Sequence, residues 1–517
     1  MNGAHALIRT LVDAGVDTCF MNPGTSEMHF VAALDDVPEM HSVLALFEGV
    51  ATGAADGYAR MAEKPAAVLL HLGPGLGNGL ANLHNARRGR TPVVNIIGDH
   101  ATYHAKYDAP LQSDIHSIAK GVSTWIRSST DPSQVADDAA DAVAAAMGPP
   151  GEVATLILPA DVCWLEAPGP VAPRPVASRA EVSADAISSV VELLGSDATV
   201  GLLIGGSVTR EAGLVAASRV ATTSGAKLIC ETFPARLERG AGLPAVERLG
   251  YLAEFAQAQL AGLDHLILVE AASPVSFFAY PDKASDLVPE GCTVHVLSVP
   301  GEDSTTALQQ VADALGAPAD GAELAAPFRT DLPTGALNAE SFATALGALL
   351  PEGAVVVDEG NTAGLFVSGF TAGAPRHDWL CLPGGAIGYG MPVSTGAAIA
   401  SPGRRVVNLQ ADGSAMYTIQ SLWTQVREGL DVTTIILNNQ SYAILNLELT
   451  RVGADPGPKA LEMLDLTNPT LDFVSIAQGL GVSATRATTA EEFTEQLERA
   501  LATPGPNLVE AILPPTL

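Results

Sequence analysis

The chain has 517 residues, of which 47% are hydrophobic and 16% charged, and its formal net charge is −30. This length and composition are typical of two to four packed domains. The acidic balance argues against nucleic-acid or anionic-membrane binding, both of which need a basic surface, and predicts a soluble acidic exterior.

The five cysteines are scattered and form no Cys-x-x-Cys pair. We therefore expect reduced thiols, with no disulfide frame and no zinc site. The first residues lack the pattern of a signal peptide, and no apolar run is long enough to cross a bilayer. A cytoplasmic protein without membrane contact is the expectation.

Short apolar runs alternate with helical stretches along the whole chain. The runs occupy residues 67–70, 93–97, 202–204, 265–269, 354–357, 406–409 and 433–437. Continuous apolar runs of this length are typical of parallel strands that are buried on both faces. The pattern predicts an α/β fold made of consecutive doubly wound parallel sheets.

Two stretches rich in proline, glycine and alanine divide the chain. Residues 167–175 contain too many prolines for a helix or an inner strand, and residues 316–335 have a similar composition. These linkers predict three domains, which cover residues 1–165, 180–318 and 335–517. Residues 50–55 (Val-Ala-Thr-Gly-Ala-Ala) match residues 393–398 (Val-Ser-Thr-Gly-Ala-Ala), and the same order of elements follows both, which indicates a duplicated domain.

The third domain carries the strongest chemical signal. Asp412, Gly413 and Ser414 follow one apolar strand, and Asn438-Asn439 follow the next, after a helix expected near residues 418–428. Both groups therefore return to the carboxyl edge of a parallel sheet, where open α/β sheets bind ligands. Asp412 and Asn439 offer oxygen ligands suited to Mg²⁺, while Gly413 and Ser414 can donate to a phosphate. Either group alone is an ordinary turn or strand end, but the combination predicts a metal-bound diphosphate.

This constellation resembles the metal and diphosphate motif, Gly-Asp-Gly followed by Asn-Asn, of thiamine-diphosphate-dependent enzymes. The relevant superfamily contains acetolactate synthase, benzoylformate decarboxylase and pyruvate decarboxylase, and Ala411 replaces the first glycine of their motif. The resemblance implies thiamine diphosphate and Mg²⁺ as cofactors. It assigns the metal to Asp412, Asn439 and the carbonyl of Ser441. It assigns the diphosphate to Asn361, Thr362, Gly413, Ser414 and Tyr442.

The N-terminal domain resembles the pyrimidine-binding part of the same enzymes. Glu48 opens a helix at the place where the family has a glutamate that hydrogen-bonds the pyrimidine ring and so promotes deprotonation of the thiazolium carbon. Taken alone, Glu48 is also an ordinary carboxylate stabilised by a helix dipole. Residues 384–391 resemble the segment that bends the cofactor, with Ile387 as the wedge and the Gly385 carbonyl facing the aminopyrimidine. The remaining implied cofactor contacts are Asn22, Pro23, Gly24 and Asn78.

The substrate pocket does not match one branch of the superfamily. His71 stands where the decarboxylase-like branch carries a histidine, and the resemblance gives it a catalytic role in proton donation. Asp99 stands where acetolactate synthases have a glutamine. Residues 275–281 lack the second histidine that benzoylformate decarboxylases contribute from the middle domain. The remaining residues expected to line the pocket are Thr25, Ser26 and His100.

The resemblance implies a 2-oxo acid decarboxylase or carboligase that works through an ylide and an enamine. Family members share each active site between two subunits, which implies a homodimer or homotetramer. An acetolactate synthase catalytic subunit and a non-catalytic cofactor-binding or regulatory paralogue are the alternatives. In the middle domain, the strand at residues 202–204 runs into Gly205-Gly206, where acetolactate synthases bind FAD. No acidic ribose ligand stands out there, so FAD is the less favoured expectation.

Overall fold

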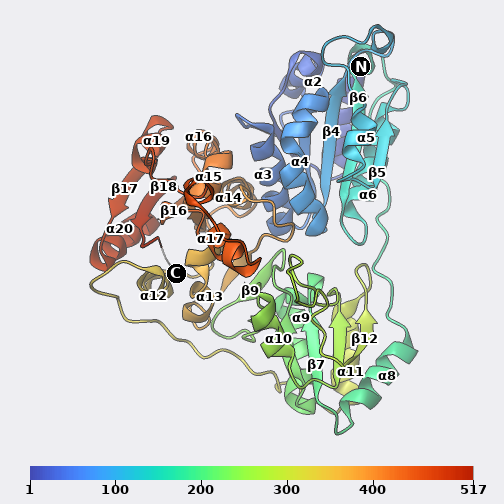
Figure 1. Ribbon diagram of the computed structural model, residues 1–517. Helices are drawn as coiled ribbons and strands as arrows, with labels where there is room; N and C mark the ends of the chain where they lie inside the picture. Colours follow the sequence, from blue (N-terminus) through green and yellow to red (C-terminus); the bar gives the residue numbers. More distant parts are fainter. Residues whose placement is uncertain (516–517) are drawn as a thin grey trace.

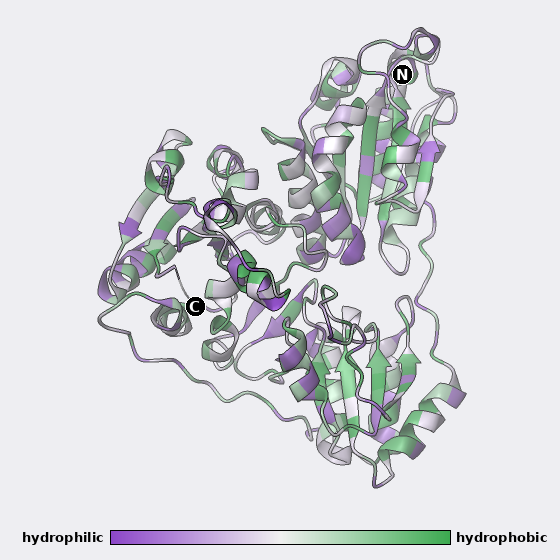
Figure 2. Cartoon of the chain, in the orientation of Figure 1, coloured by the Kyte–Doolittle hydropathy of each residue, from purple (hydrophilic) through white to green (hydrophobic). Residues whose placement is uncertain are grey.

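Three separate sheets follow one another along the chain (Figure 1). The computed structural model describes residues 1–515. Strands interleave with helices throughout, which confirms the predicted α/β class. In Figure 2 the strands at the centre of the first and middle sheets are mostly hydrophobic, as expected for strands that are covered on both faces. Among residues 1–515 no helix is both long and apolar enough to span a bilayer.

The first sheet contains six parallel strands in the order β2-β1-β3-β4-β6-β5. Its strands are β1 (Thr18–Met21), β2 (His41–Leu44), β3 (Ala66–His71), β4 (Val93–Asp99), β5 (Trp125–Ser128) and β6 (Val153–Pro159). Its helices are α1 (Gly3–Asp13), α2 (Met28–Ala33), α3 (Glu48–Ala62), α4 (Leu72–Arg88), α5 (Ile115–Ala119), α6 (Val135–Met147) and α7 (Ala160–Trp164). Helices α1, α2, α6 and α7 cover one face, while α3, α4 and α5 cover the other.

The middle sheet contains five parallel strands in the order β10-β8-β7-β11-β12. Its strands are β7 (Val200–Ile204), β8 (Lys227–Cys230), β10 (Glu247–Arg248), β11 (His265–Val269) and β12 (Thr293–Ser298). Its helices are α8 (Ala184–Leu194), α9 (Glu211–Ser224), α10 (Ala253–Leu260) and α11 (Ser304–Ala314). The two apolar clusters that contain these helices lie on opposite faces of the sheet.

The third sheet has seven strands in the order β17-β18-β16-β15-β13-β14-β9. Its strands are β9 (Leu237–Arg239), β13 (Val355–Glu359), β14 (His377–Leu380), β15 (Val406–Ala411), β16 (Val432–Asn438), β17 (Ser483–Ala487) and β18 (Asn507–Ile512). Its helices are α12 (Ala339–Leu349), α13 (Val367–Phe370), α14 (Gly390–Ala400), α15 (Asp412–Thr418), α16 (Ser421–Arg427), α17 (Ala443–Arg451), α18 (Pro458–Glu462), α19 (Phe473–Gly479) and α20 (Ala490–Ala502).

Strand β9 departs from the predicted organisation in two ways. It comes from the stretch assigned to the middle domain, yet it pairs with β14 of the third sheet, and the pairing is antiparallel. The side chain of Arg239 explains this attachment, because its guanidinium lies 4.9 Å from the ring of Trp379 and donates to the Ser368 carbonyl. Residues 167–179 and 321–334 contain no helix or strand, as expected of linkers. The domain limits given above stay a prediction.

The two sequence segments that match each other form the helices α3 and α14, which pack together. A Cβ atom at Gly57 would lie 2.1 Å from the carbonyl oxygen of Val393, and one at Gly396 would lie 1.7 Å from that of Ala54. Only glycine allows backbones to approach this closely. The pair therefore joins the first sheet to the third, and it holds Glu48, which begins α3, in a fixed relation to the segment that precedes α14.

Candidate functional site

Asp412 and the Asn439 turn meet at the carboxyl ends of the neighbouring strands β15 and β16. The Asp412 carboxylate is buried; its Oδ1 accepts the Gly413 N–H at 2.7 Å, and its Oδ2 accepts the Gln440 N–H at 2.7 Å. Asn439 Oδ1 accepts the Ser441 N–H at 3.1 Å. The structure thus places the two expected metal ligands at one sheet edge, as their spacing predicts.

The helix beside these residues differs from the one expected near residues 418–428. Helix α15 begins at Asp412 itself, and a break after Thr418 separates it from α16. An aspartate is favoured in the first turn of a helix because its charge interacts with the helix dipole. A Cβ atom at Gly413 would lie 2.3 Å from the ring of Tyr442, so the tyrosine lies directly against the glycine. Gly413 and Tyr442, both expected to bind the diphosphate, are therefore in contact with each other.

The donor set at this edge fits Mg²⁺ and a diphosphate. Burial raises the pKa of Asp412 to about 6, although backbone N–H groups, led by that of Gly413, act against the rise. A neighbouring cation would favour the ionised form. Within residues 1–515 no group of three or more His, Cys, Asp or Glu side chains could hold a metal ion. One carboxylate, the Asn439 amide and a backbone carbonyl are hard oxygen donors that leave the remaining coordination to phosphate oxygens.

Asn361 and Thr362 lie at the same edge. They begin the short 3-10 helix η5 (Asn361–Gly364), which follows β13, the strand next to β15. Asn361 has a left-handed backbone with φ of 47°, and Thr362 is buried. The hydroxyl of Ser414 accepts from Gln410 Nε2 at 2.6 Å and lies within 3.1 Å of the Ala411 carbonyl oxygen.

The segment with Gly385 and Ile387 is anchored by residues that the sequence did not single out. His84 Nε2 lies 3.0 Å from the Gly384 carbonyl oxygen, and Asn85 Nδ2 donates to the Ala386 carbonyl at 2.8 Å. Both anchors lie near the end of α4, and no sequence signal distinguishes them from other polar helix residues. Ile387 is half-buried against the apolar cluster of α14.

The expected pyrimidine side lies at the first sheet. Glu48 is half-buried at the start of α3, and Asn78 Nδ2 donates to its Oε2 at 3.0 Å. Residues 22–24 follow directly after β1. Within residues 1–515 no hydrogen bond or ion pair links Glu48 to Ile387 or Asp412. A single chain thus contains both halves of the expected cofactor site without a direct link between them.

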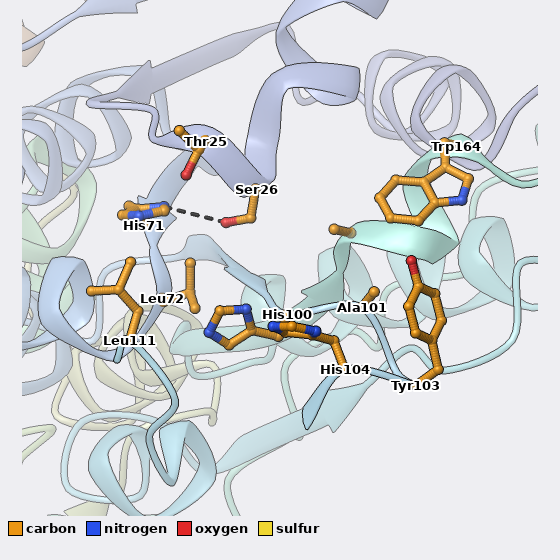
Figure 3. A pocket seen from close by; sticks show the side chains of 11 residues that line it. Thr25, Ser26, His71, Leu72, His100, Ala101, Tyr103, His104, Leu111 and Trp164 are labelled. Atoms are coloured by element: carbon orange, nitrogen blue, oxygen red, sulfur yellow. Dashed lines mark hydrogen bonds between the residues drawn. The ribbon is translucent and has the colours of Figure 1, made fainter. Parts of the chain in front are cut away.

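A cavity of 270 Å³ opens beside the same sheet edge (Figure 3). It is lined by Thr25, Ser26, His71, Leu72, His100, Ala101, Tyr103, His104, Leu111, Ala160 and Trp164. The rings of His100 and His104 are 5.3 Å apart. Asp99 is not among the lining residues; its carboxylate accepts the His100 N–H at 2.7 Å, and burial raises its pKa.

His71 lies at the junction of a strand and a helix. It is the last residue of β3, and α4 begins at Leu72, so the glycines that follow are helical. Glycine is required at two of these helical positions in spite of its weak helix propensity, because a Cβ atom at Gly79 would lie 2.8 Å from the Thr52 side chain, and one at Gly73 would lie 2.0 Å from the Ser113 hydroxyl.

Glu27 is a residue of the candidate site that sequence reasoning missed. It is 2% exposed, and its carboxylate contacts three groups: the Gly24 N–H at 2.7 Å, the Ser26 hydroxyl at 2.5 Å and His71 Nδ1 at 2.8 Å. Its position three residues after Gly24 is the available signal, since a glutamate at that spacing commonly bonds back to the first N–H of a helical turn.

Two glycines make room for this glutamate–histidine pair. A Cβ atom at Gly24 would lie 2.2 Å from the ring of His71, and one at Gly98 would lie 1.7 Å from Glu27 Oε1. Any side chain at either position would therefore displace the pair. The glycine before Asp99 is thus required by the buried carboxylate beside it.

The turn of the middle sheet does not fit a dinucleotide such as FAD. The Gly206 N–H donates to Glu231 at 3.1 Å, and the Ser207 N–H donates to Glu270 at 2.6 Å. Glu231 follows β8 and is half-buried, Glu270 follows β11 and is buried, and the two strands lie on either side of β7. Burial raises the pKa of Glu231 to about 7. A diphosphate needs these N–H groups as donors and is repelled by carboxylates. The carboxylates already occupy the donors that a nucleotide would use.

Comparison with known proteins gives matches at both ends of the chain. Residues 1–120 match the family described as thiamine pyrophosphate enzyme, N-terminal TPP binding domain. Residues 358–511 match the corresponding C-terminal TPP binding domain.

Similar proteins cover almost the whole chain. IlvX of Mycobacterium tuberculosis, whose name assigns it provisionally as an acetolactate synthase large subunit, is 59% identical over 99% of both chains. Benzoylformate decarboxylase of Pseudomonas aeruginosa is 30% identical over 96% of both. The thiamine diphosphate-dependent 4-hydroxybenzoylformate decarboxylase of Rhodococcus jostii RHA1 has a similar structure, with a TM-score of 0.86, 25% identity and 99% of each chain covered. Benzoylformate decarboxylase of Polynucleobacter necessarius shares the fold, with a TM-score of 0.83, 24% identity and 99% of each chain covered.

Proposed function

This chain belongs to the thiamine pyrophosphate enzymes, and we propose that it is an Mg²⁺-dependent decarboxylase of 2-oxo acids. The observation that carries the proposal is the Glu27–His71 pair, which presents an imidazole to a cavity beside the expected pyrimidine site. A decarboxylase needs a proton donor after carbon dioxide leaves, and a histidine can serve that purpose near neutral pH.

The residues expected to bind the cofactor come from two sheets, the first for the pyrimidine ring and the third for the metal and the diphosphate. Asp412, Asn439 and the Ser441 carbonyl would hold Mg²⁺ and, through it, the diphosphate. Glu48, supported by Asn78, would bond the pyrimidine ring. Thiamine diphosphate, when bound, supplies the electron sink for the pair of electrons released by decarboxylation.

His71 receives its orientation from Glu27. With Nδ1–H donated to the Glu27 carboxylate, the other ring nitrogen, Nε2, is left to exchange a proton with the substrate. Ser26 Oγ, 3.3 Å from the same Nδ1, bonds to the other carboxylate oxygen and steadies the arrangement. The pair resembles other catalytic histidines, in which a carboxylate fixes the tautomer and the ring orientation.

The walls of the cavity favour an aryl 2-oxo acid as substrate. Tyr103, Trp164 and Leu111 contribute apolar surface, and the rings of His100 and His104 contribute flat faces with polar edges. Such mixed walls suit an aromatic ring attached to a polar oxo acid. The names of two similar proteins, benzoylformate decarboxylase and 4-hydroxybenzoylformate decarboxylase, support this substrate class.

An acetolactate synthase-type carboligase is the second candidate. The name of the 59% identical relative favours it. The two candidates differ in product, since a decarboxylase releases an aldehyde whereas a carboligase releases a hydroxy-oxo acid. In either case we propose at least a homodimer, in which Glu48 of one subunit faces Asp412 and Ile387 of another.

The test is product analysis of the purified protein with thiamine diphosphate, Mg²⁺ and a panel of 2-oxo acids. Benzoylformate should yield carbon dioxide and benzaldehyde, and His71→Ala should lower kcat by about 10² to 10⁴-fold, the usual contribution of a general acid. His116→Ala is the matched control, because His116 is exposed on α5. Equal rates for the two variants would remove His71 from the mechanism, and a hydroxy-oxo acid product from pyruvate would select the carboligase instead.

A further inference from the structure

Glu359 is a buried carboxylate beside the segment that carries Ile387. It is the last residue of β13 and is 1% exposed. Its Oε1 accepts the Gly388 N–H at 2.5 Å, and its Oε2 accepts the Gly390 N–H at 2.7 Å. The two oxygens of one carboxylate therefore hold the backbone that directly follows Ile387.

The same carboxylate also reaches the diphosphate end of the site. Gln410 Nε2 donates to Glu359 Oε2 at 2.9 Å and to the Ser414 hydroxyl at 2.6 Å. Ser414 lies in the first turn of α15, which begins at Asp412. A continuous chain of hydrogen bonds thus connects the expected wedge with the expected diphosphate site inside one domain.

The backbone held by Glu359 is confined from other sides as well. Gly388 has a left-handed backbone with φ of 89°, and the Thr418 hydroxyl donates to its carbonyl at 2.8 Å. A Cβ atom at Gly390 would lie 2.5 Å from Gln410 Oε1. Glycine is required at Gly388 by the left-handed backbone and at Gly390 by the lack of room for a Cβ atom.

Among the residues that the structure describes, N–H groups and the Ser414 hydroxyl stabilise the Glu359 carboxylate, and no cationic side chain forms an ion pair with it. Burial raises its pKa to about 7, and the hydrogen bonds from Gln410, Gly390 and Gly388 oppose that rise. A buried charge without a cation is unfavourable for stability. What a carboxylate offers here is two acceptor atoms, which an amide cannot match because one of its polar atoms is a donor.

We infer that Glu359 is a positioning residue, whose two oxygens set the backbone at Gly388 and Gly390 and thereby the placement of Ile387 in the cofactor site. The inference rests on the proposed function, since Ile387 is expected to press the two rings of thiamine diphosphate together. Glu359 would act without touching the substrate, through the segment that it holds.

The first test needs no cofactor. In the apoprotein, Glu359→Gln should raise amide hydrogen exchange in residues 387–391 by about 10- to 100-fold, because at least one N–H loses a charge-assisted bond. Glu231→Gln is the matched control: Glu231 is a half-buried glutamate whose pKa burial also raises to about 7, but it lies at the middle sheet. Unchanged exchange in Glu359→Gln, or an equal rise in the control, would overturn the inference.

The second test uses the protein with thiamine diphosphate and Mg²⁺. Glu359→Gln should slow exchange of the cofactor C2 proton and lower kcat by about 10²-fold, while KM for the 2-oxo acid stays within about threefold. Glu359→Asp keeps the charge but is shorter, so it should show intermediate values in both experiments. If Glu359→Gln does not fold, Glu359→Asp is measured in its place. Wild-type amide exchange in residues 387–391 of the Asp variant would then overturn the inference.

The two proposals fail in different ways. Faster amide exchange in residues 387–391 of Glu359→Gln, together with a wild type that decarboxylates no 2-oxo acid, would support the role of Glu359 in holding this segment. The same result would rule out the proposed function. Faster amide exchange in Glu359→Gln with normal C2-proton exchange and normal kcat would rule out the positioning role of Glu359. That result would not affect the proposed function.

Discussion

Replacement of Glu27 tests how the protein orients His71. Glu27 Oε2 accepts from both Gly24 and His71, whereas Oε1 contacts only the Ser26 hydroxyl. Glu27→Gln can therefore place its carbonyl at the Oε2 position and its amide toward Ser26, whose hydroxyl can rotate to accept. All three contacts survive, and only the charge is lost.

The expected size of the effect follows from these contacts. A hydrogen bond to a charged group contributes about 1.5–3 kcal/mol and a neutral one about 0.5–1.5, so the His71 bond loses about 1–1.5 kcal/mol. This corresponds to about a tenfold decrease in kcat. Glu27→Leu removes every acceptor and leaves the imidazole without orientation, so kcat should fall by about 10² to 10⁴-fold.

The assay is steady-state release of carbon dioxide from benzoylformate, together with the dissociation constant of thiamine diphosphate. The Gln variant should bind the cofactor as the wild type does, because it keeps an acceptor for the Gly24 N–H. In the Leu variant, the dissociation constant separates any loss of cofactor binding from the loss of His71 orientation. Glu39→Gln is the matched control, since Glu39 is exposed in the same domain. A kcat of the Glu27→Leu enzyme within threefold of the wild type, or a Gln variant slower than the Leu variant, would show that Glu27 does not orient His71.

Further predictions concern the subunit interface, the diphosphate site, the middle domain and pH. Glu48→Gln and Asp412→Asn should each be inactive, yet hybrids reassembled from both chains should regain about a quarter of wild-type activity if sites are shared between subunits; no recovery would place each site within one chain. Gly413→Ala, whose methyl group would meet the Tyr442 ring at 2.3 Å, should weaken thiamine diphosphate binding at least tenfold by calorimetry, and unchanged binding would contradict that contact. The purified protein should carry no flavin and should show no thermal shift with ADP; a shift would contradict the reading of the middle sheet. Burial raises the pKa of Glu231 from 4.5 to about 7, so the folded state holds the proton more tightly, and about 3 kcal/mol of stability present below pH 4.5 should be lost as pH rises through 7. Glu231→Gln should remove that part of the slope of melting temperature between pH 5 and 8, and equal slopes would refute it.

The strands of the three sheets, and the residues that meet at their carboxyl ends, are the features that the apolar pattern of the sequence predicts best. The run at residues 265–269 is strand β11, and Asp412 and Asn439 come together because their strands are neighbours in a parallel sheet. These features depend on local periodicity and on the geometry of parallel sheets, both of which a single sequence carries.

The features that the sequence did not reveal depend on distant contacts. Gly73 and Gly79 occupy helical positions where Ser113 and Thr52 leave no room for a side chain. Strand β9 joins the third sheet through the contact of Arg239 with Trp379, far away in the chain. Glu27 and Glu359 owe their roles to groups that only folding brings near. The spacing of Glu27 from Gly24 indicates a bond within a helical turn but not the contact with His71, and no local pattern distinguishes Glu359 from a surface glutamate.

The central claim is that this chain uses thiamine diphosphate and Mg²⁺ to decarboxylate a 2-oxo acid. The most direct measurement is product identification after incubation of the purified protein with both cofactors and a panel of aryl and alkyl 2-oxo acids, beside the Glu48→Gln variant. We predict carbon dioxide and an aldehyde, formed fastest from an aryl substrate, with turnover abolished in the variant. No turnover of any 2-oxo acid by a protein that binds both cofactors, or equal turnover by the variant, would contradict it.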